Sequence, residues 1–259
     1  MSRIDIQSIL TPDGKHINPN LDFTLDTKDF WKDYWTSNPF GKINVDPDSK
    51  SDSLRTCHQL LYRRDLPDGT LFDLRFDFKP KYRWNDILLT NDTIVTPLNF
   101  RNYPLMQRMK DEPGFRGYIE DFMHRAYTIG GEIIFPVHGP NSINPVRGKA
   151  ADDRFDLTLL CIQRYYEGSD DLPGKNGLNW LLDVIRSDSA FFDAFGSFGG
   201  YVDFFFLNDL VDENYDTMLW IDNPERPRDR EEYDLFMRNQ MEFLERRNRR
   251  IAEYELIRQ

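Results

Sequence analysis

The sequence predicts an α+β fold, in which a small antiparallel sheet is packed by helices and the chain ends in a long C-terminal helix. The near-perfect alternation of apolar and polar residues from Leu71 to Phe78 is typical of a half-buried strand. Apolar residues recur at helical spacing through the second half of the chain. The 259 residues include 20 Phe, 12 Tyr and 5 Trp. These aromatic side chains can bury a sizeable core, which excludes general disorder.

In the first half of the chain we expect one short helix followed by strands. Residues 30–35 predict the helix, which Asn38-Pro39 would end, and the polar residues 41–53 predict a loop. Residues 58–78 predict a β-hairpin around the turn at residues 66–69, because Pro67 fixes φ and Gly69 accepts a positive φ. The second strand of this hairpin would bury one face, formed by Phe72, Leu74, Phe76 and Phe78.

The middle of the chain predicts two more strands and a helical pair. Residues 86–89 predict a strand that ends at Asn91-Asp92, and residues 132–135 predict a short buried strand closed by Pro136. Residues 101–128 predict helix interrupted at residues 112–114. Gly130-Gly131 would end that helix as a left-handed cap, and residues 137–150 predict a long loop.

The last hundred or so residues predict helices and an aromatic core segment. Asp152 or Asp153 would cap a helix that runs to Tyr166, and residues 178–185 predict another. The aromatic residues between 191 and 206 would cross the core. Residues 229–258 predict a single helix that packs along its own domain; the alternative is that it pairs with another copy of the chain. We therefore divide the chain into one α+β domain, residues 1–222, and a C-terminal helix extension, residues 223–259.

The charge distribution indicates which classes of partner the protein could bind. The net charge is −11, so extended nucleic-acid binding is not expected. Between Arg186 and Arg226 the chain has no basic residue. This acidic aromatic segment, or the C-terminal helix, would be the surface for a protein partner; the alternative is a solvated face. The segment contains nine acids: Asp188, Asp193, Asp203, Asp209, Asp212, Glu213, Asp216, Asp222 and Glu225.

The sequence favours a cytoplasmic location. It contains no apolar run long enough to span a membrane and no apolar core of a signal peptide at its N-terminus. Cys57 and Cys161, the two cysteines, lie in unrelated contexts. We therefore expect a reduced protein without a disulfide framework, a membrane contact or a Cys-based zinc site.

An ordered series of motifs begins at residues 129–136 (IGGEIIFP) and continues through residues 143–148 (INPVRG) and 153–166 (DRFDLTLLCIQRYY). This series resembles a family of uncharacterised bacterial proteins, known as a domain of unknown function. The resemblance extends upstream through residues 91–94 and downstream to residues 191–205, and it covers roughly residues 20–222. It implies a bacterial source but no reaction mechanism. The C-terminal helix would be an addition to this family.

The strongest candidate site is a polar set of Asn144, Arg147, Arg154 and Arg164, supported by Asp153 and Asp156. Arg147 precedes Gly148, which lets backbone approach a ligand, and Arg154 begins a helix. Arginine binds phosphate and carboxylate groups through two parallel hydrogen bonds, so this set predicts an anion site. The alternative is a structural network in which the arginines pair with Asp152, Asp153 or Asp156.

Other constellations are weaker. His124, His138 and Glu132 lack the spacing of a metal site, and Cys161 has the mid-helix context of a packing residue. Asp209 and Asp212 share a helical face but more often act as solvated acids. We therefore predict no metal site and assign neither a cofactor nor catalytic residues. The sequence favours a non-enzymatic binding or protein-interaction module; the alternative is an enzyme acting on a phosphorylated metabolite, a nucleotide or a nucleic-acid end.

Overall fold

The computed structural model describes residues 6–37, 46–78, 80–98, 103–174 and 176–256. Within these residues the fold is α+β, as the sequence predicts, with two small antiparallel sheets surrounded by helices. No helix in the described part of the chain is long and apolar enough to cross a membrane.

The larger sheet has four strands in the order β3-β4-β5-β6, and the smaller sheet pairs β1 with β2. Every pairing is antiparallel. At the end of the β5–β6 ladder, Thr93 lies directly opposite Glu132. The strands are β1 (Arg64–Asp65), β2 (Leu71–Phe72), β3 (Arg75–Phe76), β4 (Lys81–Trp84), β5 (Ile87–Thr93) and β6 (Glu132–Pro136).

Helices contribute most of the regular structure. Five 3-10 helices accompany the α-helices in the described residues: η1 (Ile6–Ile9), η2 (Phe23–Asp26), η3 (Ile129–Gly131), η4 (Asp193–Phe195) and η5 (Asn208–Leu210). The α-helices are α1 (Phe30–Ser37), α2 (Pro47–Lys50), α3 (Asp52–Leu61), α4 (Pro104–Met109), α5 (Phe115–Ala126), α6 (Ile143–Ala150), α7 (Phe155–Glu167), α8 (Asn176–Ser187), α9 (Ser189–Phe192), α10 (Phe198–Phe204) and α11 (Arg230–Glu253).

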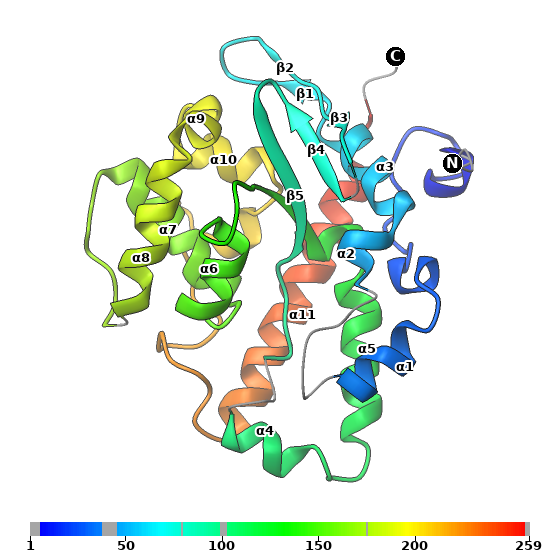
Figure 1. Ribbon diagram of the computed structural model, residues 1–259, viewed down its shortest axis with the longest axis vertical. Coiled ribbons are helices and arrows are strands. Elements are labelled where there is room, and N and C mark those ends of the chain that lie inside the picture. Colours follow the sequence, from blue (N-terminus) through cyan, green and yellow to red (C-terminus); the bar gives the residue numbers. More distant parts are fainter. Residues whose placement is uncertain (1–5, 38–45, 79, 99–102, 175, 257–259) are drawn as a thin grey trace.

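The sheet stands between two groups of helices. Figure 1 shows α6 to α10 on one side of β5, and α1, α2, α3 and α5 on the other. Helix α11 contacts α5, η3 and η5, so it joins the end of the chain to the middle of the fold. Its buried face includes Tyr233, Met237, Gln240, Leu244, Arg247 and Ile251.

The aromatic segment between residues 191 and 206 lies in the core, which confirms its predicted place. Phe195 contacts the rings of both Phe204 and Phe205, at centroid distances of 4.9 and 5.2 Å. Phe72, from the smaller sheet, stacks on Trp84 of the larger one at 4.7 Å. These ring contacts join the two sheets to the helices that follow α8.

Several predicted elements are confirmed. Helix α1 matches the first predicted helix, although its predicted end at Asn38-Pro39 lies outside the described residues. Helices α4 and α5 occupy the predicted helical stretch, and they flank its predicted interruption. Strand β6 is buried throughout, and the turn after Leu66 closes with Gly69 at φ 80°. Helices α7, α8 and α11 also form where the sequence predicts them.

The prediction of a loop over residues 41–53 is wrong for its described part. Residues 46–53 contain α2 and the start of α3. The polar side chains that indicated a loop act as helix caps: the Asp46 carboxylate accepts a hydrogen bond from the amide of Asp48, and the Ser51 hydroxyl accepts one from the amide of Leu54 at 2.9 Å. Because α3 continues to Leu61, the first strand of the predicted hairpin is confined to β1, but the hairpin itself is confirmed, since β1 pairs antiparallel with β2 around the predicted turn.

The alternation from Leu71 to Phe78 does not form one strand. It divides into β2 and β3, which belong to different sheets. Phe72 and Leu74 are fully buried as predicted, but Phe76 and Phe78 are 46% and 64% exposed. The Phe76 ring lies 4.5 Å from the Arg55 guanidinium, so a cation–π contact replaces burial in the core.

The structure also corrects three predictions for the region around the main motif. The predicted long loop over residues 137–150 contains α6. Gly130 and Gly131 lie in η3 without a left-handed φ; a Cβ on Gly131 would lie 1.8 Å from the carbonyl oxygen of Ala126, so close approach explains this glycine. Arg154 is the N-cap residue of α7, and neither Asp152 nor Asp153 caps this helix with its side chain.

Candidate functional site

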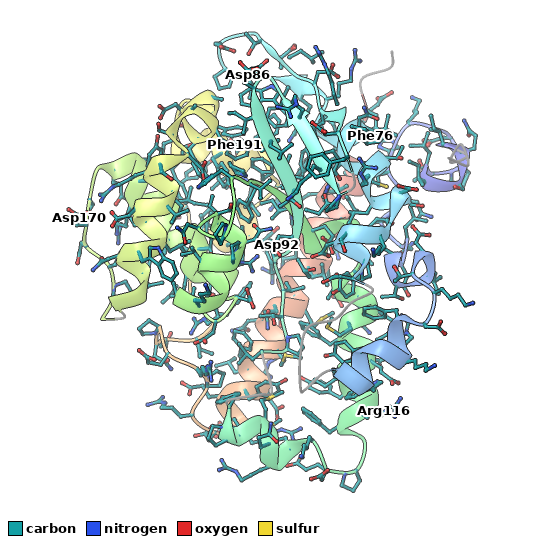
Figure 2. All side chains as sticks on the ribbon, in the orientation of Figure 1. Phe76, Asp86, Asp92, Arg116, Asp170 and Phe191 are labelled. Carbon is teal, nitrogen blue, oxygen red and sulfur yellow. The ribbon has the colours of Figure 1, made fainter. Side chains whose placement is uncertain are left out.

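A cavity of about 830 Å³ lies at the polar end of β5. This volume is in the range of small-molecule sites, about 300–1,000 Å³. Asp92, which lines it, lies near the centre of the molecule, whereas Asp86 lies at the opposite end of the sheet (Figure 2). The lining residues are Tyr34, Asp46, Asp48, Ser49, Lys50, Pro80, Thr90, Asn91, Asp92, Thr93, Val95, Thr96, Pro97, Leu98, Met123, Tyr127, Asn144, Pro145 and Asp153.

Asn91 fixes the wall formed by β5 and α2. Its side-chain oxygen accepts hydrogen bonds from His58 Nδ1 at 2.8 Å and from the Tyr82 hydroxyl at 2.6 Å. Its side-chain nitrogen donates to the carbonyl oxygen of Asp48 at 2.8 Å. Burial lowers the pKa of His58 to about 3, so the imidazole is neutral at physiological pH. This chain of hydrogen bonds holds Asp48 beside the strand.

Carboxyl groups dominate the charge of the cavity wall. Asp46, Asp48, Asp92 and Asp153 line it, whereas Lys50 is the one basic residue among the described lining residues. Burial and the neighbouring carboxylates Asp46 and Asp92 raise the pKa of Asp48 well above its usual range. Burial raises the pKa of Asp92 to about 6, although the Arg147 guanidinium opposes this shift. The surroundings of Asp48 and Asp92 therefore disfavour the ionised forms of these two acids.

Arg147 stands behind this wall and pairs with Asp92. The Arg147 side chain is 1% exposed, and the Asp92 side chain is 21% exposed. The guanidinium donates hydrogen bonds to the Asp92 carboxylate, to the carbonyl oxygen of Thr93 at 3.0 Å and to that of Asp153 at 2.7 Å. Arg147 therefore ties α6 to the end of β5 and to the turn before α7.

Asp152 and Asp153 form that turn, and both have left-handed backbone conformations, with φ of 54° and 60°. Aspartate tolerates this conformation better than most residues. Asp152 pairs with Arg226 at 2.7 Å, while Asp153 points along the cavity wall beside Gly148. A Cβ at residue 148 would lie 3.0 Å from Asp153 Oδ1, so this glycine makes room for the carboxylate.

Three buried side-chain oxygens around the cavity have no hydrogen-bond partner among the described residues. They are Tyr34 Oη, Asn144 Oδ1 and Glu132 Oε2, and Arg147 Nε, behind the wall, is a donor that also lacks one. Tyr34 and Asn144 line the cavity directly. Glu132 is fully buried behind the lining residue Thr93, whose hydroxyl lies 3.3 Å from Glu132 Oε1. Unsatisfied buried polar groups are rare in proteins, and three of them around one cavity indicate a polar binding site.

The cavity also has an apolar part. Val95, Leu98 and Met123 line it, together with the rings of Tyr34 and Tyr127. Tyr127 donates from its hydroxyl to Asp46 Oδ1 at 3.1 Å, so its ring lies beside the acidic part of the wall. The cavity therefore offers apolar surface next to carboxylates.

The structure separates the residues that the sequence places in one anion site. Asn144 and Asp153 line the cavity, with Arg147 behind them. Arg154 and Asp156 form a separate ion pair at 2.5 Å, with both side chains fully buried. The Arg154 guanidinium also donates to the carbonyl oxygens of Asn223 and Glu225, at 2.8 and 2.7 Å.

Arg164 lies ten residues further along α7 than Arg154, about 15 Å at 1.5 Å per residue. It donates to the carbonyl oxygen of Asp171 at 2.7 Å and to the Glu167 carboxylate at 2.6 Å. Asn144, Arg147 and Asp153 thus share one region of the molecule, whereas Arg154, Asp156 and Arg164 lie elsewhere.

The histidines do not converge on Glu132. His124 lies 2.6 Å from an Asp22 oxygen, and His138 lies 3.4 Å from an Asp188 oxygen. Among the described residues, no group of three or more His, Cys, Asp or Glu side chains is arranged to hold a metal ion. Cys57 and Cys161 are both buried free thiols.

Sequence reasoning missed most of the cavity wall. Asp46 and Asp48 fall in the stretch expected to be a loop, where the capping pattern of Asp46-Pro47 would have indicated a helix start. Asp92 belongs to a pair interpreted as a strand end, although the strand continues to Thr93. Glu132 could have been noted as an acid that opens a buried strand, since such a residue needs a partner.

Comparison with known proteins identifies the family. The model of a family of unknown function, DUF6994, matches residues 17–251, so the chain belongs to that family. The match extends through most of α11, so the expectation that the C-terminal helix is an addition to the family is wrong. No curated protein and no solved structure matches the chain.

Proposed function

We propose that this member of the DUF6994 family is a binding protein that takes a small ligand carrying a protonated amine into the cavity at the end of β5. The observation that carries the proposal is the set of three unpartnered buried polar atoms around that cavity. Tyr34 Oη is free to donate or accept a hydrogen bond, Asn144 Oδ1 can only accept, and the Glu132 carboxyl group can only accept once it has lost its proton. The two acceptors call for a ligand that donates hydrogen bonds.

The charge of the wall supports a cation. Four Asp side chains and one Lys line the cavity, and Glu132 lies behind Thr93. The two terminal nitrogens of the Arg147 guanidinium, next to this wall, already donate to a carboxylate and two carbonyl oxygens, and its Nε has no partner among the described residues. An ammonium group carries a positive charge and up to three N–H donors, so it complements these acceptors.

The apolar part of the wall supports an organic amine rather than a bare ion. Val95, Leu98, Met123 and the two tyrosine rings would contact the alkyl or aromatic part of the ligand. The cavity volume also exceeds the need of a single ion, since it matches small-molecule pockets. A linear or aromatic amine of metabolite size fits both parts of the wall.

A thermal-shift screen tests the proposal. The wild type would be melted with 1,4-diaminobutane, spermidine, agmatine and tyramine, and separately with inorganic phosphate, nucleotides and sugar phosphates. A ligand at about 100 times its dissociation constant adds about 2.7 kcal/mol to the free energy of unfolding. We expect at least one amine to raise the melting temperature by several degrees, because each kcal/mol is worth about 2–4 °C in a protein of this size.

Two variants locate the binding. Asp48→Asn removes one charge from the cavity wall, and we expect it to weaken amine binding about 10- to 100-fold, since a hydrogen bond to a charged group contributes about 1.5–3 kcal/mol. Asp86→Asn is the matched control, because Asp86 is exposed at the far end of the sheet (Figure 2). Equal effects of the two variants, or no shift with any amine, would contradict the proposal.

The anion site predicted from Asn144, Arg147, Arg154 and Arg164 stays a prediction, and the anionic half of the screen tests it. A shift with a phosphate compound that Arg147→Ala abolishes, in a variant that still folds, would favour this site over the amine. It would also justify assays for turnover on phosphorylated substrates. The arrangement of Arg154 and Arg164 away from the cavity supports the amine more than the anion.

The remaining expectations stay predictions. A protein partner would meet the carboxylates of the acidic aromatic segment rather than most of its rings, since Phe191, Phe195 and Phe205 are buried. A bacterial source and a cytoplasmic location are consistent with the resemblance and with the composition. Co-purification of a partner lost on charge reversal at Asp212 and Glu213 would support the interaction role.

A further inference from the structure

The floor of the cavity has fewer hydrogen-bond donors than its carboxyl oxygens require. The Thr93 hydroxyl lies 3.0 Å from Asp48 Oδ1 and 3.3 Å from Glu132 Oε1. A hydroxyl carries one hydrogen, so it can serve only one of these oxygens at a time. Glu132 Oε2 has no donor at all among the described residues. If both carboxyl groups were ionised, at least one further proton or cation would be needed to satisfy their oxygens.

The two carboxyl groups meet at the same Thr93 hydroxyl, so two ionised carboxylates would stand together in a buried region with a single hydrogen between them. A proton on one of them removes this repulsion and supplies the missing donor. Glu132 is the better holder because it is fully buried, whereas Asp48 is half-buried at the cavity wall. A protonated Glu132 would donate to Asp48 and leave the Thr93 hydroxyl free to donate as well.

We propose that Asp48 and Glu132 hold one proton between them and exchange it for the ammonium group of the ligand. This inference rests on the proposed function, since it names how that same cavity takes a cation. In the exchange, the proton leaves Glu132 for the solvent, and the ligand N–H groups take its place between the two carboxylates. The charge of the site is then conserved, because one positive charge replaces another.

The groups around the pair support this exchange. Asp46 at the N-cap of α2 and Asp92 on β5 both raise the pKa of Glu132, together with burial and Asp48. On α11, Arg247 donates to the carbonyl oxygen of Glu132 at 2.9 Å, on the backbone rather than on the carboxyl group. These acids outnumber the cation. The pair is therefore stabilised by a positive charge, which is either the shared proton or the ammonium group of the ligand.

The other titratable neighbours stay neutral. On α3, burial lowers the pKa of His58 to about 3. Tyr62, Tyr82 and Tyr127 have pKa values raised by burial, so their hydroxyl groups keep their hydrogens. On α6, Arg147 is engaged by Asp92. Above the pKa of Asp92, which burial raises to about 6, the proton released on binding therefore has one source, the Asp48 and Glu132 pair.

Calorimetry of 1,4-diaminobutane binding to the full chain tests the exchange. Titrations in two buffers of different ionisation enthalpy, neither containing a primary amine, count the protons released. We expect about one proton per bound ligand, and an affinity that rises about tenfold per pH unit below the pKa of the pair and is constant above it. Binding with no proton release and no such pH dependence would overturn the exchange while leaving amine binding intact.

Two variants make the test specific. Glu132→Gln keeps the shape of the side chain but cannot release a proton, so we expect weaker binding, without proton release and without pH dependence. Asp86→Asn is the control and should release the same proton as the wild type. If Glu132→Gln fails to fold, Asp48→Asn replaces it, because a lone buried Glu132 would stay protonated and release no proton on binding.

Infrared spectroscopy tests for the proton shared by Asp48 and Glu132 independently of ligand binding. At neutral pH we expect the carbonyl band of a protonated carboxyl group in the wild type and in Asp86→Asn, and its loss in Glu132→Gln. Absence of this band from the wild type would overturn the proton-holding pair, whatever binds in the cavity. If the band is present and no amine binds, the proposed function and the exchange fail, but the shared proton stands.

Discussion

Two buried polar clusters in this protein contain the same kinds of side chain but differ in how completely their hydrogen bonds are satisfied. In the first, Arg154 and Asp156 are fully buried and paired at 2.5 Å. The remaining donors of Arg154 reach two carbonyl oxygens, and Asp156 also accepts from the amide of Trp220 at 3.0 Å. No group in this cluster depends on solvent or ligand.

The second cluster surrounds the cavity at the end of β5 and is incomplete. Arg147 and Asp92 pair there, but Asp48 and Glu132 share the single hydrogen of Thr93. Glu132 Oε2 has no donor within the described residues. Both clusters contain a buried ion pair, so such a pair does not by itself indicate a binding site. Unsatisfied polar groups beside a cavity do.

The largest effect is expected from breaking the complete cluster. Asp156→Asn leaves the fully buried Arg154 without its counter-charge, so we expect the free energy of unfolding to fall by about 3–5 kcal/mol. Urea denaturation measures this loss. A loss below about 1 kcal/mol would show that the carbonyl oxygens alone satisfy Arg154 and would weaken the comparison.

A smaller effect is expected from the same kind of change in the incomplete cluster. Arg147→Met removes the partner of Asp92, which is 21% exposed and can take up a proton because its pKa is already raised to about 6. We expect the free energy of unfolding to fall by about 2 kcal/mol, mainly through lost hydrogen bonds. Amine binding should survive in this variant. If amine binding disappears while the variant remains folded, Arg147 belongs to the binding surface itself.

The pH dependence of stability sharpens the comparison further. Burial and the neighbouring carboxylates raise the pKa of Glu132 in the folded protein, so folding favours its protonated form. Its contribution to stability is complete below about pH 4 and is lost as the pH rises through the folded-state pKa. The wild type should therefore lose stability relative to Glu132→Gln as the pH rises from the unfolded-state pKa, about 4, to the raised folded-state pKa. A constant difference, measured by urea denaturation, would mean that Glu132 is ionised throughout.

The smallest effect is expected at the other end of the cavity. Tyr34→Phe removes a buried hydroxyl that has no partner among the described residues. Without ligand we expect a change in the free energy of unfolding of at most about 1 kcal/mol, in the stabilising direction, because an unsatisfied polar group is removed. A destabilisation of more than about 2 kcal/mol, seen in the same denaturation assay, would mean that the hydroxyl has a partner after all.

Patterns within short stretches of sequence predicted the elements that are determined by apolar spacing or by turn residue types. The buried strand β6, the helix α7 and the helix α11 follow from apolar spacing, and the turn at Gly69 follows from its residue types. Helix α2 was missed because its polar residues act through caps, which composition alone does not distinguish from a loop. The prediction of one continuous strand after Leu71 is wrong because two short strands form there and join different sheets.

The cavity could not be predicted from any one stretch of sequence. Its wall joins Asp48 of α2, Thr93 of β5 and Asn144 of α6, and Glu132 lies behind Thr93 only because β6 pairs with β5. Of the predicted site residues, Asn144 and Asp153 line this wall and Arg147 supports it. Which acids lack donors depends on this tertiary pairing, so it becomes visible only in the folded chain.

The location of a bound amine tests the central claim most directly. A crystal structure of the wild type grown with saturating 1,4-diaminobutane would show which atoms surround the ligand nitrogen. We predict that one ammonium nitrogen lies about 3 Å from carboxyl oxygens of Asp48 and Glu132, with the alkyl chain toward Val95 and Met123. An amine bound elsewhere, or a phosphate from the same experiment seated on Arg147 in the cavity, would contradict it.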